Sequence, residues 1–237
     1  VDRYNQSSLL KVQGEKFEIR SQRWCAKQWP PAEWKNVPER TTLKIGALVM
    51  ILQNDQAGPG KRRQYVNGDL AHVVGVVRAE QSGPGEDIGV GAIDGFLPES
   101  EGEAAAEATA VPVADSFGTV APGEISAVEV ELLRTGQRVF IGRVTRPTYQ
   151  FNEPDMDSLP PGPAKLRVRR DRVPGMTRRV WILGELNYIP LRLAYATTVH
   201  KSQGLTLDRV QINPKAYFFG HPQMAYVALS RARSAAG

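Results

Sequence analysis

The chain has 237 residues, 41% of them hydrophobic, which is enough for one large domain or two smaller ones. No apolar run approaches the roughly eighteen residues that span a membrane, and the N-terminus lacks the pattern of a secretion signal. Cys25 is the single cysteine, which excludes an internal disulfide framework and a cysteine-rich zinc site. We therefore expect a cytoplasmic protein, and the net charge of +5 permits a polyanionic partner without identifying it. The chain begins at Val1, and we expect further sequence upstream.

The first forty residues contain three tryptophans, Trp24, Trp29 and Trp34, separated by polar residues and prolines. They are compatible with a stacking platform for unpaired bases. Anchoring of an irregular segment to the core is the favoured interpretation, because aromatic side chains chiefly contribute buried area.

Residues 41–78 have the composition of strands. The segment 43–52 ends in a continuous apolar run, which is typical of a strand buried on both faces. Asn67-Gly68 predicts a turn, because both residues tolerate a positive φ. A further strand is expected at 73–77.

Residues 79–186 differ from their surroundings in composition. The part from 80 to 124 is rich in Gly, Pro, Ala and acidic residues, and predicts a flexible loop. Short alternating segments follow at 126–133, 137–145, 164–172 and 178–186, with a hairpin signal at Thr135-Gly136. This spacing predicts a small antiparallel β-barrel inserted into the surrounding domain.

One of these predicted strands, 164–172, has an alternating charge pattern. Lys165, Arg167 and Arg169 alternate with Leu166 and Val168, so three cations are expected on one face and the apolar residues inward. Such a ridge suits a phosphate backbone, although a merely solvated strand face explains the charges equally well.

The last stretch, 187–237, predicts alternating strands and helices. We expect strands at 191–196 and 209–212, a loop between them, and a helix that begins at His221-Pro222 and runs to Ser230. Tyr226, Val227 and Leu229 would form its apolar face. This order is typical of half of an α/β nucleotide-driven motor.

Three blocks of this sequence resemble RecD-like superfamily-one helicases. ATTVHKSQGLTLD at 196–208 resembles motif V of that family, and YVALSRAR at 226–233 resembles its motif VI. LKIGALVM at 43–50, followed by VNGD at 66–69, resembles the segment before the insertion in that family. The resemblance implies an α/β fold, in which 1–78 and 187–237 form the second RecA-like motor domain with a mainly parallel sheet. It also implies that 79–186 is an inserted SH3-like barrel.

The resemblance also implies the roles of individual residues. The front of the motif V block would contact the DNA backbone, and its donors are of the kind that bind phosphate on a strand-to-helix loop: Thr197, Thr198, His200, Lys201 and Ser202. The rear, with Gln203, Gly204 and Thr206, would face the nucleotide, and Gly204 permits close backbone approach. Arg231 would be the arginine finger, because a guanidinium on a rigid helix meets the charge that develops during phosphoryl transfer.

The phosphate-binding half of such a motor is missing from the sequence. No GxxxxGK(S/T) pattern occurs in the 237 residues. The resemblance then implies that ATP and Mg²⁺ are held by an N-terminal motor domain outside this chain, which alone would be inactive as an ATPase. Expected partners are that domain, single-stranded DNA and possible repair-nuclease subunits, with no membrane. Two alternatives are a motor-subunit fragment of a multi-subunit DNA-repair exonuclease and a non-catalytic DNA-binding scaffold.

Overall fold

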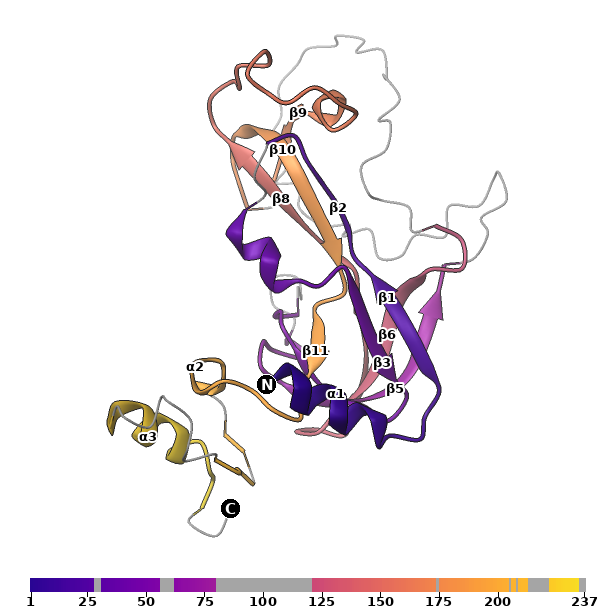
Figure 1. Cartoon of the computed structure of the whole chain (residues 1–237), viewed down its shortest axis with the longest axis vertical. Helices are drawn as coiled ribbons and strands as arrows, with labels where there is room; N and C mark the ends of the chain where they lie inside the picture. Colours follow the sequence, from indigo (N-terminus) through magenta and orange to yellow (C-terminus); the bar gives the residue numbers. More distant parts are fainter. Residues whose placement is uncertain are drawn as a thin grey trace, which may run out of the picture.

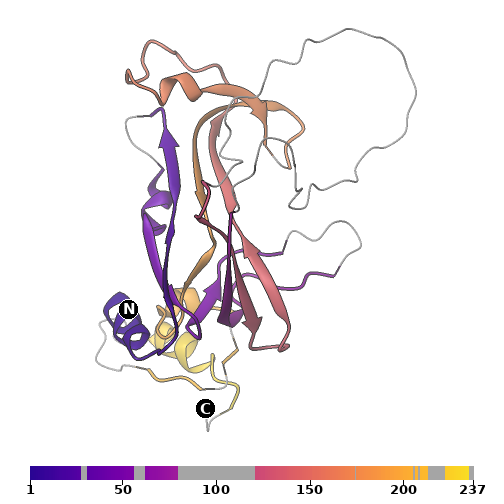
Figure 2. The ribbon, with the colours of Figure 1, turned by 90° about the vertical axis from the view of Figure 1, so that its right-hand side faces the viewer.

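The computed structural model describes residues 1–27, 31–55, 62–79, 121–173, 175–204, 206–207, 209–212 and 222–234. Its strands are β1 Lys16–Arg20, β2 Gln22–Cys25, β3 Arg40–Lys44, β4 Leu48–Ile51, β5 Leu70–Arg78, β6 Ile125–Leu132, β7 Arg138–Gly142, β8 Val144–Gln150, β9 Arg169–Arg172, β10 Arg179–Tyr188 and β11 Leu191–Leu193. Its α-helices are α1 Asp2–Leu10, α2 Val199–Ser202 and α3 Pro222–Leu229, and its 3₁₀-helices are η1 Ala32–Asn36 and η2 Lys165–Arg167. In Figures 1 and 2 the ends of β8 and β10, with β9, form one end of the molecule, and the three α-helices lie toward the other end.

A five-stranded antiparallel sheet in the order β11-β4-β5-β6-β7 holds the main core. Alternation in β6 directs Val128, Val130 and Leu132 inward, where each is fully buried. Val49 and Ile51 of β4 join the same cluster from the neighbouring part of the sheet. Burial of these branched side chains, each contributing roughly 1.5–3 kcal/mol, is the main stabilising term of this sheet.

A second sheet is built around the long strand β10, which is buried along almost its whole length. β2 and β8 pair with its two edges, and β9 pairs with its first residues, all antiparallel. β1 and β3 form a separate antiparallel ribbon.

The buried side chain of Arg143 ties the two sheets and the ribbon together. It donates hydrogen bonds to the carbonyl oxygens of Ile125 (2.9 Å) and Arg20 (3.0 Å), and to Oδ1 of Asn187 (3.1 Å). Burial lowers the pKa of this guanidinium from its ordinary value, and the nearby Glu124 carboxylate opposes that shift.

The predicted mainly parallel sheet is wrong for the described strands, because every strand pair in the three sheets is antiparallel. A strand buried on both faces has the same apolar run whichever way its neighbours point, so the sequence could not settle the direction. The one parallel pairing among these residues is an isolated bridge between Leu207 and Ala232.

No closed barrel forms in the part of the chain that the structure describes. Of the segments predicted to build it, β6 and β7 extend the main sheet, whereas β9 and β10 belong to the second one, together with β8, which was not predicted. The sheets run across the predicted boundaries at 78/79 and 186/187, and the division into a motor domain and an insertion stays a prediction. Most of the predicted flexible loop, 80–120, lies outside the described residues.

The predicted strand 164–172 is wrong in its first half. Residues Lys165–Arg167 form the 3₁₀-helix η2, and only Arg169–Arg172 pair as a strand. The N–H of Arg167 donates to the carbonyl oxygen of Ala164 and the N–H of Val168 to that of Lys165, both at 3.2 Å, so these groups bond locally and not to a neighbouring strand. Leu166, expected inward, is 88% exposed as a result. Residues 209–212, predicted as a strand, have no regular structure.

Other local predictions are confirmed. Gly68 and Gly136 have φ of 96° and 67°, as the two predicted turns require. Trp24 and Trp34 are buried, in agreement with their anchoring role, whereas Trp29 lies outside the described residues. Strands occur near 43–52, 73–77, 126–133, 137–145 and 178–186, and α3 begins at Pro222.

Candidate nucleotide and nucleic-acid interface

The segment after β11 carries most of the predicted site residues. It forms a short turn and then α2. Thr197 is half-buried and Thr198 exposed just before the helix, and His200 is exposed within it. Ser202 is buried, and its hydroxyl donates to the carbonyl oxygen of Val199 at 2.8 Å. Ser202 therefore stabilises its own helix in this structure. The side chain of Lys201 lies outside the described residues.

Gly204 ends the turn that follows α2. Its φ of 84° lies in the left-handed region, where a side chain would be strained, although a Cβ there would meet no neighbour within 4 Å. Its backbone conformation thus explains the glycine, rather than a close packing contact within the chain. Gln203 and Thr206, on either side of it, are exposed.

The structure joins the motif V and motif VI segments directly. The N–H of Leu207 donates to the carbonyl oxygen of Arg231 at 2.8 Å, and the N–H of Arg233 donates to that of Leu207 at 2.9 Å. These two bonds form the isolated parallel bridge. Arg231 is thereby held close in space to the segment that carries Gln203, Gly204 and Thr206.

The side chain of Arg231 lies along its own helix. Its Nε donates to the carbonyl oxygen of Val227 at 2.9 Å, and a terminal nitrogen donates to Oγ of Ser230 at 2.8 Å. The guanidinium is half-buried and positioned by α3. The predicted apolar face of this helix is wrong for Tyr226 and Leu229, which are 74% and 64% exposed.

Asn5 is a positioning residue that the sequence did not reveal. This side chain of α1 is 4% exposed, accepts from the N–H of Ala196 at 2.7 Å and donates to its carbonyl oxygen at 3.0 Å. The first residue of the motif V block is thus fixed to the N-terminal helix. An asparagine in a polar helix carries no local signal of such a contact.

The predicted basic ridge is not a single face. Lys165 and Arg167 lie in η2, whereas Arg169 lies in β9 and contacts the buried Glu185, Oε1 of which accepts from a terminal nitrogen of Arg169 at 2.5 Å. Nε1 of Trp24 donates to the other oxygen of Glu185 at 3.1 Å. Arg169 therefore compensates a buried carboxylate, a structural role that is incompatible with the predicted shared ridge.

A groove of about 880 Å³ runs from α1 and Gln203 to β8. Four basic residues line it, against one acidic residue, Asp2; they are Lys35, Arg40, Arg146 and Arg192. The guanidinium of Arg146 lies 5.5 Å from the ring centroid of Tyr188, a cation–π contact at the groove wall. Burial raises the pKa of Tyr188 above its ordinary value of 10.0, and Arg146 opposes that rise.

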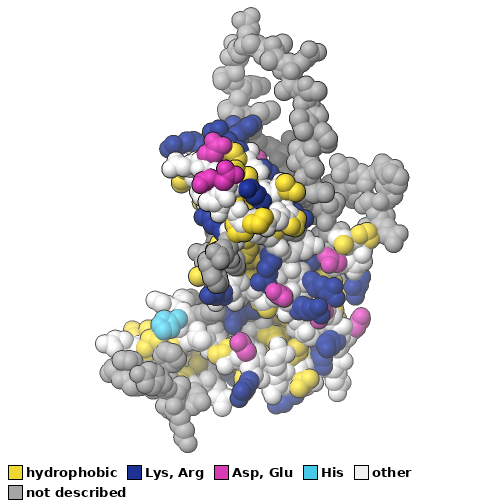
Figure 3. Space-filling model, turned by 45° about the horizontal axis from the view of Figure 1, so that its top comes forward, with side chains coloured by type: hydrophobic (Ala, Val, Ile, Leu, Met, Phe, Trp, Pro, Cys, Tyr) yellow, Lys and Arg dark blue, Asp and Glu magenta, His cyan; other side chains and the backbone are white. Residues whose placement is uncertain are grey.

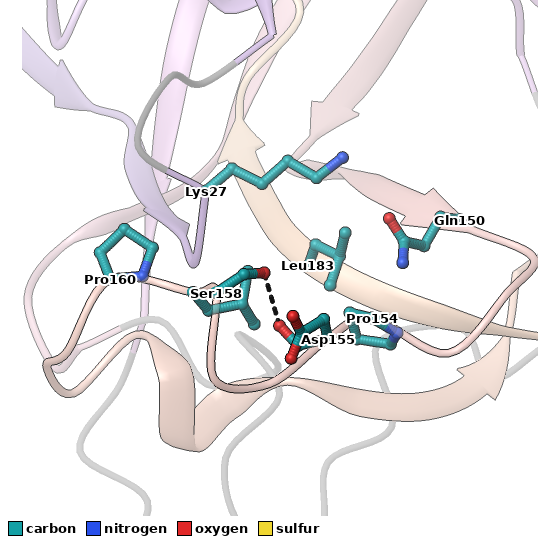
Figure 4. A pocket seen from close by; sticks show the side chains of 8 residues that line it. Lys27, Gln150, Pro154, Asp155, Ser158, Pro160 and Leu183 are labelled. Carbon is teal, nitrogen blue, oxygen red and sulfur yellow. Dashed lines mark hydrogen bonds between the residues drawn. The ribbon is translucent and has the colours of Figure 1, made fainter.

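A smaller cavity of about 280 Å³ lies beside the end of β8 (Figure 4). Lys27, Gln150 and Leu183 line it together with the 154–160 loop, in which Oγ of Ser158 donates to the carbonyl oxygen of Asp155 at 2.7 Å. None of the predicted site residues belongs to it.

Within the described ranges, no three His, Cys, Asp or Glu side chains converge on a point that could hold a metal ion. No described helix combines the length and the apolar character needed to cross a bilayer.

Comparison with solved structures shows that the fold is shared with part of two Pif1 structures. The unliganded Pif1 from Bacteroides superposes with a TM-score of 0.54 at 22% identity over 98% of this chain and 36% of that one. The Pif1 helicase from Candida albicans gives a TM-score of 0.56 at 22% identity, over 100% of this chain and 42% of that one. The chain thus spans less than half the length of these helicases.

Sequence comparison finds helicases named Pif1 that are similar to between a fifth and a quarter of the chain. The ATP-dependent DNA helicase Pif1 of Bdellovibrio bacteriovorus is 52% identical over 56 residues, 24% of this chain and 12% of the relative. The human ATP-dependent DNA helicase PIF1 is 55% identical over 49 residues, 21% of this chain and 7% of the relative. No family model matches the chain. This segment is homologous to Pif1, a superfamily-one helicase, and none of these relatives is named as a RecD-like protein.

Proposed function

We propose that this chain is part of the motor of a longer ATP-dependent 5′ to 3′ DNA helicase of the Pif1 branch. The observation that carries the proposal is the backbone bridge between Leu207 and the Arg231–Arg233 segment, which brings the predicted nucleotide-facing and arginine-finger residues together. The homology to helicases named Pif1 supports the same activity. Related Bacteroides Pif1 structures contain single-stranded DNA, or ADP-AlF4, a mimic of ATP during hydrolysis.

Arg231 is the residue assigned to the chemistry. On closure of the motor, its guanidinium exchanges its bonds to Val227 and Ser230 for contacts to the transferring phosphoryl group, where it offsets developing negative charge. Gln203, Gly204 and Thr206 face the same nucleotide from the bridged segment. ATP would supply the phosphoryl group, and a separate N-terminal motor domain would hold its phosphates and Mg²⁺.

Binding of DNA is assigned to α2 and the turn that precedes it. Thr197, Thr198, His200 and Lys201 supply donors to the phosphate backbone, and the groove beside Gln203 adds a net positive lining. Ser202 supports the helix through its bond to Val199. Because the contacts are to backbone phosphates, binding is independent of base sequence.

A cytoplasmic setting and the partners are further parts of this proposal. It acts in the cytoplasm, on single-stranded DNA, together with the N-terminal motor domain. Two alternatives stay predictions: membership of the RecD-like helicases, and association with the nuclease subunits of a DNA-repair exonuclease. The named relatives favour the Pif1 branch. A non-catalytic scaffold is disfavoured, because it has no chemical need for Arg231.

Mutation of Arg231 in the full-length gene product tests the proposal. Arg231→Ala is expected to lower DNA-stimulated ATP hydrolysis by about a thousandfold or more, which is the usual contribution of an arginine finger. Binding of single-stranded DNA without nucleotide should change little, because Arg231 is assigned to phosphoryl transfer. Hydrolysis is measured by phosphate release, and binding by fluorescence anisotropy.

Arg138→Ala is the matched control, since Arg138 is an exposed cation on β7 outside the motif segments. It should retain full hydrolysis. Equal activity of the Arg231 and Arg138 variants, or no DNA-stimulated hydrolysis in the unmodified full-length protein, would refute the proposal.

A further inference from the structure

The β9–β10 ladder has an exposed face composed of cations and one aromatic residue. Arg172 lies opposite Arg179, and Arg170 lies opposite Trp181. Opposed residues of an antiparallel pair point to the same side, as do alternate residues of one strand. Arg170, Arg172 and Arg179 are all exposed, and Trp181 is half-buried. Gln150 of β8 lies opposite Trp181 on its other edge and completes the row.

The other residues of the paired segments of β9 and β10 point to the opposite side of the ladder. Val180 and Ile182 are buried there in the second core cluster, and Arg169 contacts Glu185 and Asp171. Asp171, the one acidic residue of β9, is thus directed away from Arg170 and Arg172. We call the exposed side, made of Arg170, Arg172, Arg179, Trp181 and Gln150, the outer β9–β10 face.

Two features of this face indicate an anionic ligand. Like charges directly opposite one another destabilise a strand pair, and Arg172 and Arg179 occupy such positions. Among the described residues, no carboxylate pairs with these two side chains or with Arg170. The charge is therefore concentrated on a short, rigid ladder whose geometry the buried face fixes.

Trp181 indicates which kind of anionic ligand fits this face. A half-exposed indole between Arg170 and Gln150 offers a flat surface with a cation on one side and an amide on the other. Unpaired bases stack on such rings, whereas the bases of a duplex are already stacked on each other. A strand of unpaired nucleotides satisfies both the arginines and the indole, because its phosphates and bases alternate along its length.

We propose that the outer β9–β10 face binds single-stranded nucleic acid, with the three arginines on the phosphates and Trp181 stacked on a base. The choice of nucleic acid rests on the proposed helicase function, although the face itself does not depend on Arg231. It lies at the end of the molecule opposite α2 and α3 (Figure 1), where Lys and Arg side chains gather in Figure 3. It is therefore a second contact, well separated from the motif V segment.

The salt dependence of oligonucleotide binding tests the role of the arginines. The full-length protein is titrated, without nucleotide, against a fluorescein-labelled oligo-dT of about 16 nucleotides over a range of NaCl concentrations. The variant Arg170→Ala/Arg172→Ala/Arg179→Ala should bind about tenfold or more weakly at low salt. Its slope of log affinity against log salt should be about 2 units shallower, since each neutralised phosphate contributes about 0.7. The control Lys16→Ala/Arg20→Ala/Arg138→Ala removes equal charge elsewhere and should keep the full slope.

An abasic oligonucleotide of equal length tests the role of Trp181. Trp181→Ala should weaken oligo-dT binding by about fivefold or more, the usual effect of losing one stacked base, and leave abasic binding unchanged. Equal weakening for both ligands would mean that Trp181 only supports the fold of the face, and would overturn the stacking assignment.

The outcomes separate this proposal from the helicase function. An arginine variant that binds like the charge-matched control overturns the outer face as a binding site, even where DNA-stimulated ATP hydrolysis is intact. Loss of affinity in that variant supports it, even where hydrolysis is absent. Tighter binding of the unmodified protein to vesicles of phosphatidylglycerol than to oligo-dT, abolished by the arginine substitutions, would assign the face to a membrane and overturn the proposal.

Discussion

Arg169 and Arg170 are adjacent in β9, but their side chains point to opposite sides of the strand because successive residues of a strand alternate. Arg169 points inward and holds the buried Glu185, whereas Arg170 points outward on the same strand. A buried carboxylate is stable only when its oxygens are hydrogen-bonded, and Trp24 and Arg169 satisfy one each. The predicted ridge grouped Arg169 with exposed cations because charge alone does not reveal which face is covered.

Arg169→Ala is therefore expected to destabilise the fold by about 2–3 kcal/mol, because Glu185 stays buried with one oxygen unpaired. Arg170→Ala, next to it in the sequence, should change the free energy of unfolding by no more than about 0.5 kcal/mol. Urea unfolding followed by tryptophan fluorescence measures both. Similar values for the two variants would contradict the assigned directions of these side chains.

At the scale of elements, β10 organises the second sheet because three strands pair with it. β10 approaches β2 closely at Gly184, which lies opposite Cys25. A Cβ on Gly184 would lie 2.8 Å from the carbonyl oxygen of Trp24 and 3.1 Å from Cα of Cys25. A register shift in the β8 pairing between Ile182 and Gly184 occurs at the same point. The glycine thus permits close strand approach where the ladder is irregular.

Gly184→Ala should force β2 away from β10 and cost about 1–3 kcal/mol of stability. Gly142→Ala, at the end of β7, is the matched control, since its Cβ would meet no atom within 4 Å. The control should change stability by less than about 0.5 kcal/mol. The midpoints of thermal or urea unfolding of the two variants are compared. An unchanged midpoint for Gly184→Ala would show that stability does not depend on the close approach of β2 and β10.

At the scale of the whole molecule, the N-terminal helix and the C-terminal motif segments are joined through one side chain. Asn5 and Ala196 are 191 positions apart, yet both backbone groups of Ala196 bond to the Asn5 amide. The Leu207–Ala232 bridge then connects this segment to the residues around Arg231. α1 therefore contributes to the placement of the candidate site without touching a ligand.

Asn5→Ala should leave the N–H and carbonyl of Ala196 without these partners and destabilise this junction by about 1–3 kcal/mol. Asn5→Asp, which keeps the acceptor and loses the donor, should fall between wild type and alanine. Hydrogen exchange at the Ala196 amide is the readout, with the exposed Gln6→Ala as control. Unchanged exchange in Asn5→Ala would show that the junction does not depend on this side chain.

The sequence determined those features that depend on a few neighbouring residues. Asn67-Gly68 and Thr135-Gly136 specify turns because a positive φ is a property of the residue itself. Apolar runs specified most strands, and Pro222 marked the start of α3. The motif V and motif VI blocks indicated a helicase, and the homology to Pif1 agrees with that class.

Only the tertiary structure decided strand direction, sheet order and the function of each charge. β4 is largely buried and β10 is buried along most of its length. Each pairs with a strand more than a hundred residues away, β11 and β2, and neither apolar run specifies that partner. The same holds for Asn5, Glu185 and Arg169, whose partners are distant in the sequence. A short-range pattern fixes the conformation of a segment, whereas a buried polar side chain is defined by the group that satisfies it.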